Sequence, residues 1–280
     1  MIAGIEMGGT KTVVAVGEAN GSVIEEFRYP TTDGPETFAT AIDWLGKRGV
    51  PSAIGVAAFG PVSVGRDRPD FGSMLATPKP GWAGFSITGA LGEAFPEARV
   101  ELETDVNAAA LAEADGLEDL VYITIGTGIG GGVLSGGKLV HGVLHPEFGH
   151  WLPRRADGDD FAGVCPFHAD CLEGMASGPA IAKRWGKEAK DLPAGHQAWE
   201  FETHYLAQAV MTLLATVNPA RVVIGGGVSQ AEGFHEQVEA KVREWANGYF
   251  PALDENKPFV VPPKYEQQAG IRGALLLVGQ

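Results

Sequence analysis

The chain has 280 residues, 45% of them hydrophobic, which is enough for one large globular domain or two of ordinary size. Its 21 Lys and Arg residues against 35 Asp and Glu residues give a net charge of −14, which argues against a nucleic-acid or membrane surface. No apolar run approaches the roughly 20 residues of a membrane-spanning helix, and the N-terminus does not resemble a signal peptide, so we expect a cytoplasmic protein.

Strands and glycine turns alternate in the first third of the chain. Apolar runs between glycine turns predict a meander of three antiparallel strands within residues 2–29. A long loop rich in proline and glycine is typical of a functional segment, and its Trp82 is expected either in the core or stacked on a ligand. The elements expected after the meander are a helix (35–47), a buried strand (53–58), this loop (60–84), a helix (86–95), a strand (98–103) and an alanine-rich helix (106–115).

The strand and glycine pattern recurs over residues 120–142, which suggests an internal repeat. We therefore predict an α/β protein of two related lobes, 1–115 and 116–268, with a ligand cleft between them. A terminal helix (about 269–280) is expected to pack back on the first lobe. The remaining elements are expected at 178–186 (helix), about 198–217 (helix), 221–224 (strand), 231–246 (helix), near 259 (strand) and 269–278 (helix).

Three glycine turns are candidates for binding a nucleotide. Glycine lets backbone N–H groups approach phosphate oxygens without a Cβ in the way, although such a turn also occurs where the backbone merely needs a positive φ. Neither a P-loop nor a dinucleotide fingerprint fits, because a strand follows the first two turns where those motifs require a helix. The candidate residues are Gly8, Gly9, Thr10 and Lys11; Gly126, Thr127 and Gly128; and Gly225, Gly226 and Gly227, which precede a predicted helix.

Asp105 and Asn107 begin the alanine-rich helix at the predicted lobe boundary. Asp105 is expected to be either the N-cap of this helix or a general base that takes the proton of a substrate hydroxyl during phosphoryl transfer. Asn107 is expected either on the helix surface or in contact with a substrate hydroxyl.

Residues 145–174 contain both cysteines of the chain and three of its seven histidines. His150, Cys165, His168 and Cys171 have the residue types and spacing of a structural zinc site, since thiolates and imidazoles are the usual tetrahedral ligands. The alternative is an ordinary loop with two reduced thiols. The other polar residues of this region are expected to be a solvated loop face (Asp157, Asp159 and Asp160) and structural histidines (His141 and His145).

An ordered set of motifs resembles the ROK family of sugar kinases, and within it the bacterial fructokinases. The motifs span nearly the whole chain: EMGGTKT, AAFGP, TPKPGW, TDVNAAALAE, IGTGIGGG, HPEFGH, CPFHADCLEG, ASGP and IGGGVS. The resemblance implies a duplicated actin-like, ribonuclease-H-like fold that binds ATP and Mg²⁺. It also implies transfer of phosphate to the 6-hydroxyl of a hexose, with glucose and mannose as alternatives to fructose, and it favours a homodimer.

The resemblance also implies roles for individual residues. Asp105 falls on the catalytic base, and the zinc would be structural, because its four protein ligands leave no open position. Glu6 stands where the superfamily usually has Asp, and His168 replaces a cysteine of the glucokinase-like members, which favours fructose as the substrate. A sugar-responsive repressor is disfavoured, because it needs a DNA-binding module. The candidate substrate contacts are Asn107, Glu147, Glu173, Gly60 and Pro61.

Overall fold

The computed structural model describes residues 1–77, 79–253 and 257–279, and it divides into two compact units. Unit 1 comprises Met1–Asp115, Leu139–Pro146 and Gln267–Gln280, and unit 2 comprises Gly116–Lys138 and Glu147–Glu266. Pro78 of the TPKPGW motif and Gln280 of the expected terminal helix lie outside the described residues. Within those residues, every helix is too short or too polar to cross a membrane.

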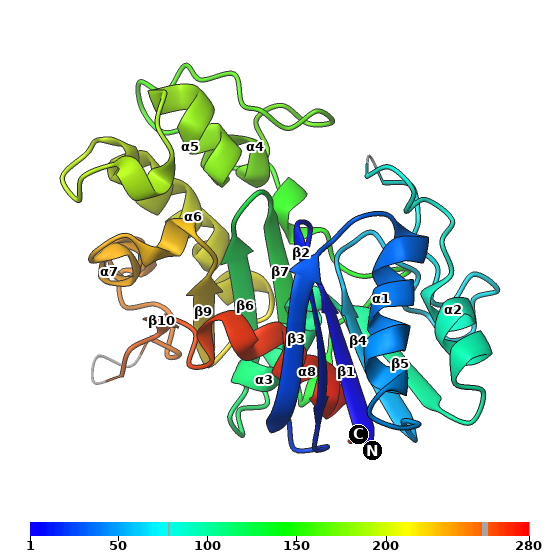
Figure 1. Cartoon of the computed structure of the whole chain (residues 1–280). Coiled ribbons are helices and arrows are strands. Elements are labelled where there is room, and N and C mark those ends of the chain that lie inside the picture. The colour runs from blue at the N-terminus through cyan, green and yellow to red at the C-terminus, as the bar shows by residue number, and fades with distance from the viewer. Residues whose placement is uncertain (78, 254–256, 280) are drawn as a thin grey trace. The chain divides into compact units, whose positions relative to one another are not determined.

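Unit 1 is built on a five-stranded sheet in the order β3-β2-β1-β4-β5 (Figure 1). The predicted meander is confirmed, because β1 pairs antiparallel with β2 and β2 pairs antiparallel with β3. The next two strands run parallel to β1, and Met7, Ala58 and Thr104 are aligned across the three strands. These strands therefore end at one edge of the sheet. The strands are β1 (Ile2–Met7), β2 (Lys11–Gly17), β3 (Val23–Pro30), β4 (Ala53–Ala58) and β5 (Arg99–Thr104).

Four helices accompany this sheet. In the first of them, the Asp33 side chain accepts a hydrogen bond from Glu36 N at 2.9 Å, which caps the helix just before Pro35. The last helix of the chain contacts β1 and β4. Gly55 permits this contact, because a Cβ at Gly55 would lie 1.7 Å from the carbonyl oxygen of Ala274. The helices are α1 (Gly34–Gly46), α2 (Ile87–Ala94), α3 (Asp105–Glu113) and α8 (Ala269–Leu277).

Trp82 belongs to the core of unit 1. Its side chain is fully buried, its ring contacts those of Phe38, Phe59 and Phe85, and its Nε1 donates to Thr32 O at 2.7 Å. The alternative that Trp82 stacks on a ligand is therefore wrong. Its indole anchors the long loop between β4 and α2.

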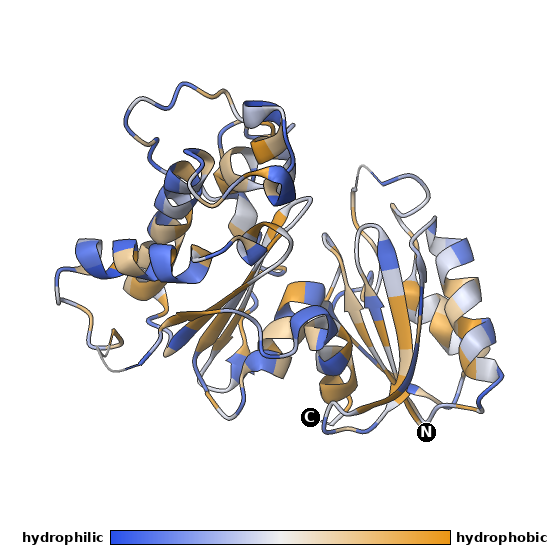
Figure 2. Cartoon of the chain, turned by 60° about the vertical axis from the view of Figure 1, so that its left-hand side comes forward, coloured by the Kyte–Doolittle hydropathy of each residue, from blue (hydrophilic) through white to orange (hydrophobic). Residues whose placement is uncertain are grey.

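Unit 2 repeats the plan of unit 1, with a sheet in the order β10-β9-β6-β7-β8. β6 pairs antiparallel with β7 and parallel with β9, as β1 does with β2 and β4, which confirms the predicted duplication. In both sheets the strands are predominantly hydrophobic, whereas the helices mix polar and apolar residues (Figure 2). The strands are β6 (Leu120–Ile125), β7 (Ile129–Ser135), β8 (Lys138–Leu139), β9 (Arg221–Gly225) and β10 (Val260–Val261).

The helices of unit 2 differ from the prediction at two places. A five-residue helix, α4, follows Cys171 and was not predicted. The helix expected over 231–246 begins only at Phe234, since Gly233 precedes it with a φ of 70° and a 3₁₀ turn occupies Val228–Gln230. The helices are α4 (Leu172–Ala176), α5 (Gly178–Trp185), α6 (Ala198–Thr216) and α7 (Phe234–Ala246).

Candidate functional site

The first glycine turn lies at the strand-end edge of unit 1, between β1 and β2. Gly8 N donates to Lys11 O at 2.9 Å, and Thr31 holds the turn through hydrogen bonds to the carbonyls of Gly8 and Thr10. Gly8 and Gly9 do not lie in the left-handed region, so the interpretation that this turn merely needs a positive φ is wrong. Gly9 and Thr10 are exposed, which leaves their backbone and hydroxyl groups open to a ligand.

Asp105 follows β5 at the same edge. Thr104 is the N-cap of α3, because its side chain accepts from Asn107 N at 3.2 Å. The alternative that Asp105 caps the helix is therefore wrong, and Asp105 is instead the first residue of α3, with a half-buried carboxylate. Asn107 is fully buried and donates through Nδ2 to Glu103 Oε1 at 3.1 Å, so it does not lie on the helix surface.

Two histidines attach residues 139–146 to unit 1. His141 Nε2 pairs with Glu103, and this hydrogen bond raises the pKa of His141 above its ordinary value. His145 Nε2 accepts a hydrogen bond from Val62 N at 3.2 Å, directly after Gly60 and Pro61. Both histidines therefore contact residues that lie beside predicted site residues. Glu103 was missed, because its place in a strand of alternating charge suggests an exposed side chain, whereas it is 4% exposed.

The two glycine turns of unit 2 follow parallel strands β6 and β9. Gly126 and Gly227 have open space where a Cβ would stand, so their backbones are accessible to a ligand. Gly226 has a φ of 93°, and a Cβ there would lie 2.3 Å from Ile125 O, so packing also requires this glycine. The 3₁₀ turn Val228–Gln230 separates these glycines from the predicted helix, which begins at Phe234.

A pocket of about 340 Å³ opens beside Gly227. Leu192, Trp199 and Val228 line it and are buried, whereas its charged lining residues, Lys190 and Glu232, are exposed. The lining of this pocket therefore mixes apolar side chains with polar and charged groups, as many small-molecule sites do. The pocket was not predicted, because its walls come from three separate segments of the chain.

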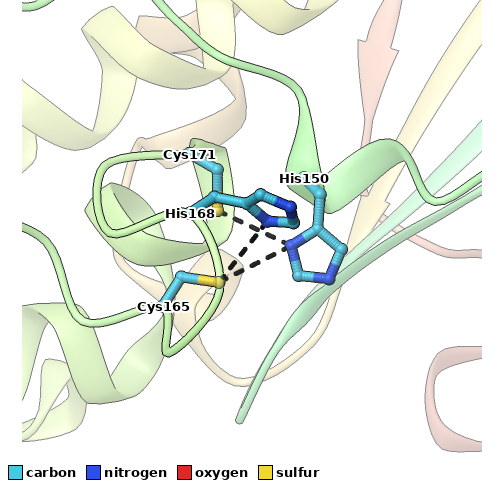
Figure 3. A group of neighbouring side chains, drawn as sticks. All are labelled: His150, Cys165, His168 and Cys171. Carbon is cyan, nitrogen blue, oxygen red and sulfur yellow. Dashed lines mark hydrogen bonds between the residues drawn. The ribbon is translucent and has the colours of Figure 1, made fainter. Parts of the chain in front are cut away.

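The four predicted metal ligands converge in unit 2 (Figure 3). Their nitrogen and sulfur atoms all lie within 4.8 Å of one another. His150 Nδ1 is 3.7 Å from Cys165 Sγ and 3.6 Å from Cys171 Sγ, and His168 Nδ1 is 3.8 Å from Cys165 Sγ. A tetrahedral zinc ion, with Zn–S of ~2.3 Å and Zn–N of ~2.0 Å, places nitrogen and sulfur about 3.5 Å apart. The site is therefore compatible with zinc.

Local backbone structure brings these ligands together. Cys165 and Ala169 exchange two backbone hydrogen bonds, of 3.2 and 3.0 Å, in a tight turn that also carries His168. Cys171 is the N-cap of α4, and its sulfur accepts a hydrogen bond from Gly174 N at 3.5 Å. Burial raises the pKa of the Cys171 thiol to about 11, and a bound cation would favour the thiolate instead.

The two predicted substrate glutamates lie next to metal ligands in the sequence. Glu147 precedes the 3₁₀ turn Phe148–His150 and is exposed. Glu173 lies in α4, two residues after Cys171, and its Oε2 accepts from Ile129 N at 3.0 Å. A Cβ at Gly128 would lie 2.6 Å from Glu173 Oε2, so Gly128 makes room for this carboxylate. An ion held by His150 and Cys171 would thus restrain the backbone that carries both glutamates.

Asp159 is not part of a solvated loop face, contrary to expectation. Its side chain is 3% exposed and pairs with Arg184 at 3.0 Å, and Tyr205 donates a hydrogen bond to the same carboxylate oxygen. The Arg184 guanidinium also lies 4.5 Å from the ring centroid of Phe161. This buried cluster fastens the loop before the metal site to α5 and α6.

We predict that Asp159→Asn destabilises the protein by about 3–5 kcal/mol, because it leaves the buried Arg184 charge without its anionic partner. The midpoint of urea denaturation measures this change. Asp160→Asn is the matched control, since Asp160 is exposed and its change should stay within about 0.5 kcal/mol. If both variants lose the same small amount of stability, the Asp159–Arg184 pair does not have the stabilising role assigned to it.

Known proteins similar to this chain agree on one family. The chain matches the ROK family over residues 2–280. It is 42% identical to the fructokinase of Zymomonas mobilis, over 98% of this chain and 94% of that protein, and 39% identical to the fructokinase of Pediococcus pentosaceus, over 99% and 97%. The crystal structure of the ROK hexokinase from Thermus thermophilus is similar at a TM-score of 0.80 and 28% identity, covering 99% of this chain and 97% of that one. These likenesses confirm the predicted duplicated, actin-like α/β fold.

Proposed function

Because this chain belongs to the ROK family, we propose that it is a fructokinase, which transfers the γ-phosphoryl group of ATP to the 6-hydroxyl of D-fructose. The observation that carries the proposal is the similarity to fructokinases along nearly the whole chain. The structure supports it with open glycine turns and with a half-buried carboxylate at a helix start.

Asp105 is the proposed general base. It accepts the proton of the 6-hydroxyl as this oxygen attacks the γ-phosphorus, the bond to the β,γ-bridging oxygen breaks and ADP leaves. Its position supports this role, because Thr104 supplies the N-cap and Asp105 is left half-buried at the first position of α3.

The hydroxyl groups of the sugar are proposed to bind to Asn107, Glu147 and Glu173, with Gly60 and Pro61 shaping the substrate site. Carboxylates are strong acceptors for hydroxyl donors. The hydrogen bond from Asn107 Nδ2 to Glu103 fixes the orientation of the Asn107 amide, and the one from Ile129 N does the same for the Glu173 carboxylate. Such fixed polar groups lose little entropy when a substrate binds.

ATP is proposed to bind at the glycine turns. The phosphates would use donors of the Gly8–Lys11 and Gly126–Gly128 turns other than Gly8 N and Gly126 N, which donate within their own turns. The adenosine would occupy the pocket beside Gly225–Gly227. A magnesium ion at this site would offset the charge of the phosphates. Glu6 fits such an ion, because its Oε2 is buried without a hydrogen-bond partner among the described residues. Burial also raises the pKa of Glu6 to about 7, and a nearby cation would favour its ionised form.

Zinc is the ion proposed for His150, Cys165, His168 and Cys171. Two thiolates and two imidazoles fill a tetrahedral shell, so the ion would be structural and would take no part in phosphoryl transfer. It would hold the segments that carry Glu147 and Glu173. A homodimer in the cytoplasm belongs to the same proposal, and light scattering measures the oligomeric state directly.

The test is ADP release by the purified protein at saturating ATP and Mg²⁺ with fructose, mannose and glucose. We expect the highest kcat/KM with fructose and a 6-phosphorylated product. A higher kcat/KM with glucose or mannose would show that fructose is not the preferred substrate, although the protein would still be a hexose kinase. No turnover of any of these sugars would contradict the proposed function.

A further inference from the structure

Lys79 lies against the first glycine turn of unit 1. Its Nζ donates a hydrogen bond to the carbonyl oxygen of Gly9. A Cβ at Gly9 would stand 3.8 Å from Lys79 Cε and 4.0 Å from Nζ. The ammonium group of Lys79 therefore lies at the middle of the turn, although 70 residues of sequence separate Lys79 from Gly9.

The charge of Lys79 has no carboxylate within salt-bridge distance in the described part of the chain, unlike that of Lys47, which pairs with Asp43 at 2.7 Å. The Lys79 ammonium lies 5.0 Å from the ring centroid of Phe59, and its partners are a neutral carbonyl and this aromatic face. Partial burial lowers the pKa of Lys79. A partly desolvated cation with neutral partners is stabilised when an anion binds beside it.

The turn itself indicates which anion would bind. Gly9 and Thr10 are exposed and offer backbone N–H groups and a hydroxyl, the donors that form phosphate-binding concavities. A lysine ammonium adds a compact point charge, which is a common partner of phosphate. A sugar hydroxyl, by contrast, carries no charge for the Lys79 ammonium to offset.

We propose that Lys79 is a catalytic residue that contacts a terminal phosphate of ATP at the Gly8–Thr10 turn and neutralises the charge that develops during transfer. This rests on the proposed function of the turn as a phosphate site. The roles of the two residues are separate: Asp105 receives the proton of the attacking hydroxyl, whereas Lys79 keeps its proton throughout. The bond formed joins the sugar oxygen to the γ-phosphorus, and ADP is the leaving group.

The test compares Lys79→Met and Lys79→Arg with the control Lys47→Met, a change of the exposed lysine at the C-cap of α1. We expect Lys79→Met to lower kcat by about 10²-fold, the usual effect of removing one electrostatic donor, with the KM for fructose changed less than about twofold. The kcat of Lys79→Arg should be at least about tenfold higher than that of Lys79→Met, because arginine restores the positive charge. Lys47→Met should match the wild type, and thermal unfolding shows whether each variant is folded.

Calorimetric binding separates this proposal from the proposed function. Lys79→Met should weaken the binding of MgATP about tenfold and leave the affinity for adenosine unchanged, since Lys79 is proposed to contact only phosphate. Wild-type kcat and MgATP affinity in Lys79→Met would overturn the role of Lys79 while the kinase activity stands. If the wild-type protein binds MgATP but phosphorylates no hexose, the proposed function fails, and the binding comparison still decides whether Lys79 contacts phosphate. Equal losses of affinity for MgATP and for adenosine would also overturn the proposal, because they would indicate a general distortion of the binding site.

Discussion

Asp105→Asn should lower kcat by about 10²- to 10⁴-fold, the range expected for loss of a general base. Asparagine keeps the size of the side chain and an acceptor oxygen, but it cannot take the proton of the attacking hydroxyl. The Kd for fructose should stay within about threefold of the wild type, because the proton is transferred only in the transition state. Initial rates of ADP release and fructose titration by calorimetry measure the two quantities.

Asp115→Asn is the matched control for this substitution. Asp115 follows the same helix at its other end, is exposed and has a φ of 47°, a conformation that asparagine also adopts readily. Its turnover and urea midpoint should match those of the wild type. Near-normal kcat in Asp105→Asn would remove this residue from the chemical step, and a large loss of stability would show that its role is structural.

Among the predicted substitutions, loss of the metal site should have the second largest effect, and it should lower both thermal stability and fructose affinity. Wild-type protein should contain about one zinc ion per chain, and Cys171→Ser should contain almost none. Zinc contributes on the order of 10 kcal/mol of apparent binding free energy in small zinc domains, so the loss should lower the thermal midpoint clearly. Fructose affinity should fall with it, because the ion would restrain the segments of Glu147 and Glu173. Elemental analysis, calorimetry and fructose titration measure these outcomes.

Asp170→Asn tests whether any change in the same loop has this effect. Asp170 pairs with Arg155 at 2.8 Å, and both side chains are about two-fifths exposed, so this variant should keep its zinc and most of its stability. Chelation followed by zinc addition should lower and then restore fructose affinity in the wild-type protein. A metal-free protein with full activity would refute the structural role.

Local signals accounted for most of the fold. The apolar runs before Gly8 and Gly126 predicted the first strand of each sheet, and the glycines predicted where each strand ends. The repeat of this pattern was enough to infer duplication, which the shared strand order confirms. The spacing of the cysteines and histidines likewise predicted four metal ligands, and the structure places them side by side.

Features that depend on distant residues could not be predicted. Glu103 looks like an exposed strand residue, but it is buried and pairs with His141, which lies 38 residues further along the chain. Asp159 lies among exposed acidic residues, and only Arg184 of α5 explains its burial. The choice between Thr104 and Asp105 as N-cap depends on one hydrogen bond, since both residue types serve well. The five residues of α4 are too few for a helical period to be recognised.

The position of α8 has a consequence for the order in which the chain can fold. This helix is the last of the chain, yet it supplies Ile271, Ala274 and Leu275, all fully buried, to unit 1. Domains generally fold in the order of synthesis, from the N-terminus onward. Here the strands of unit 1 are made before unit 2, whereas α8 is made after it, so unit 2 can be complete before unit 1. Unit 1 therefore closes only after α8 has been made.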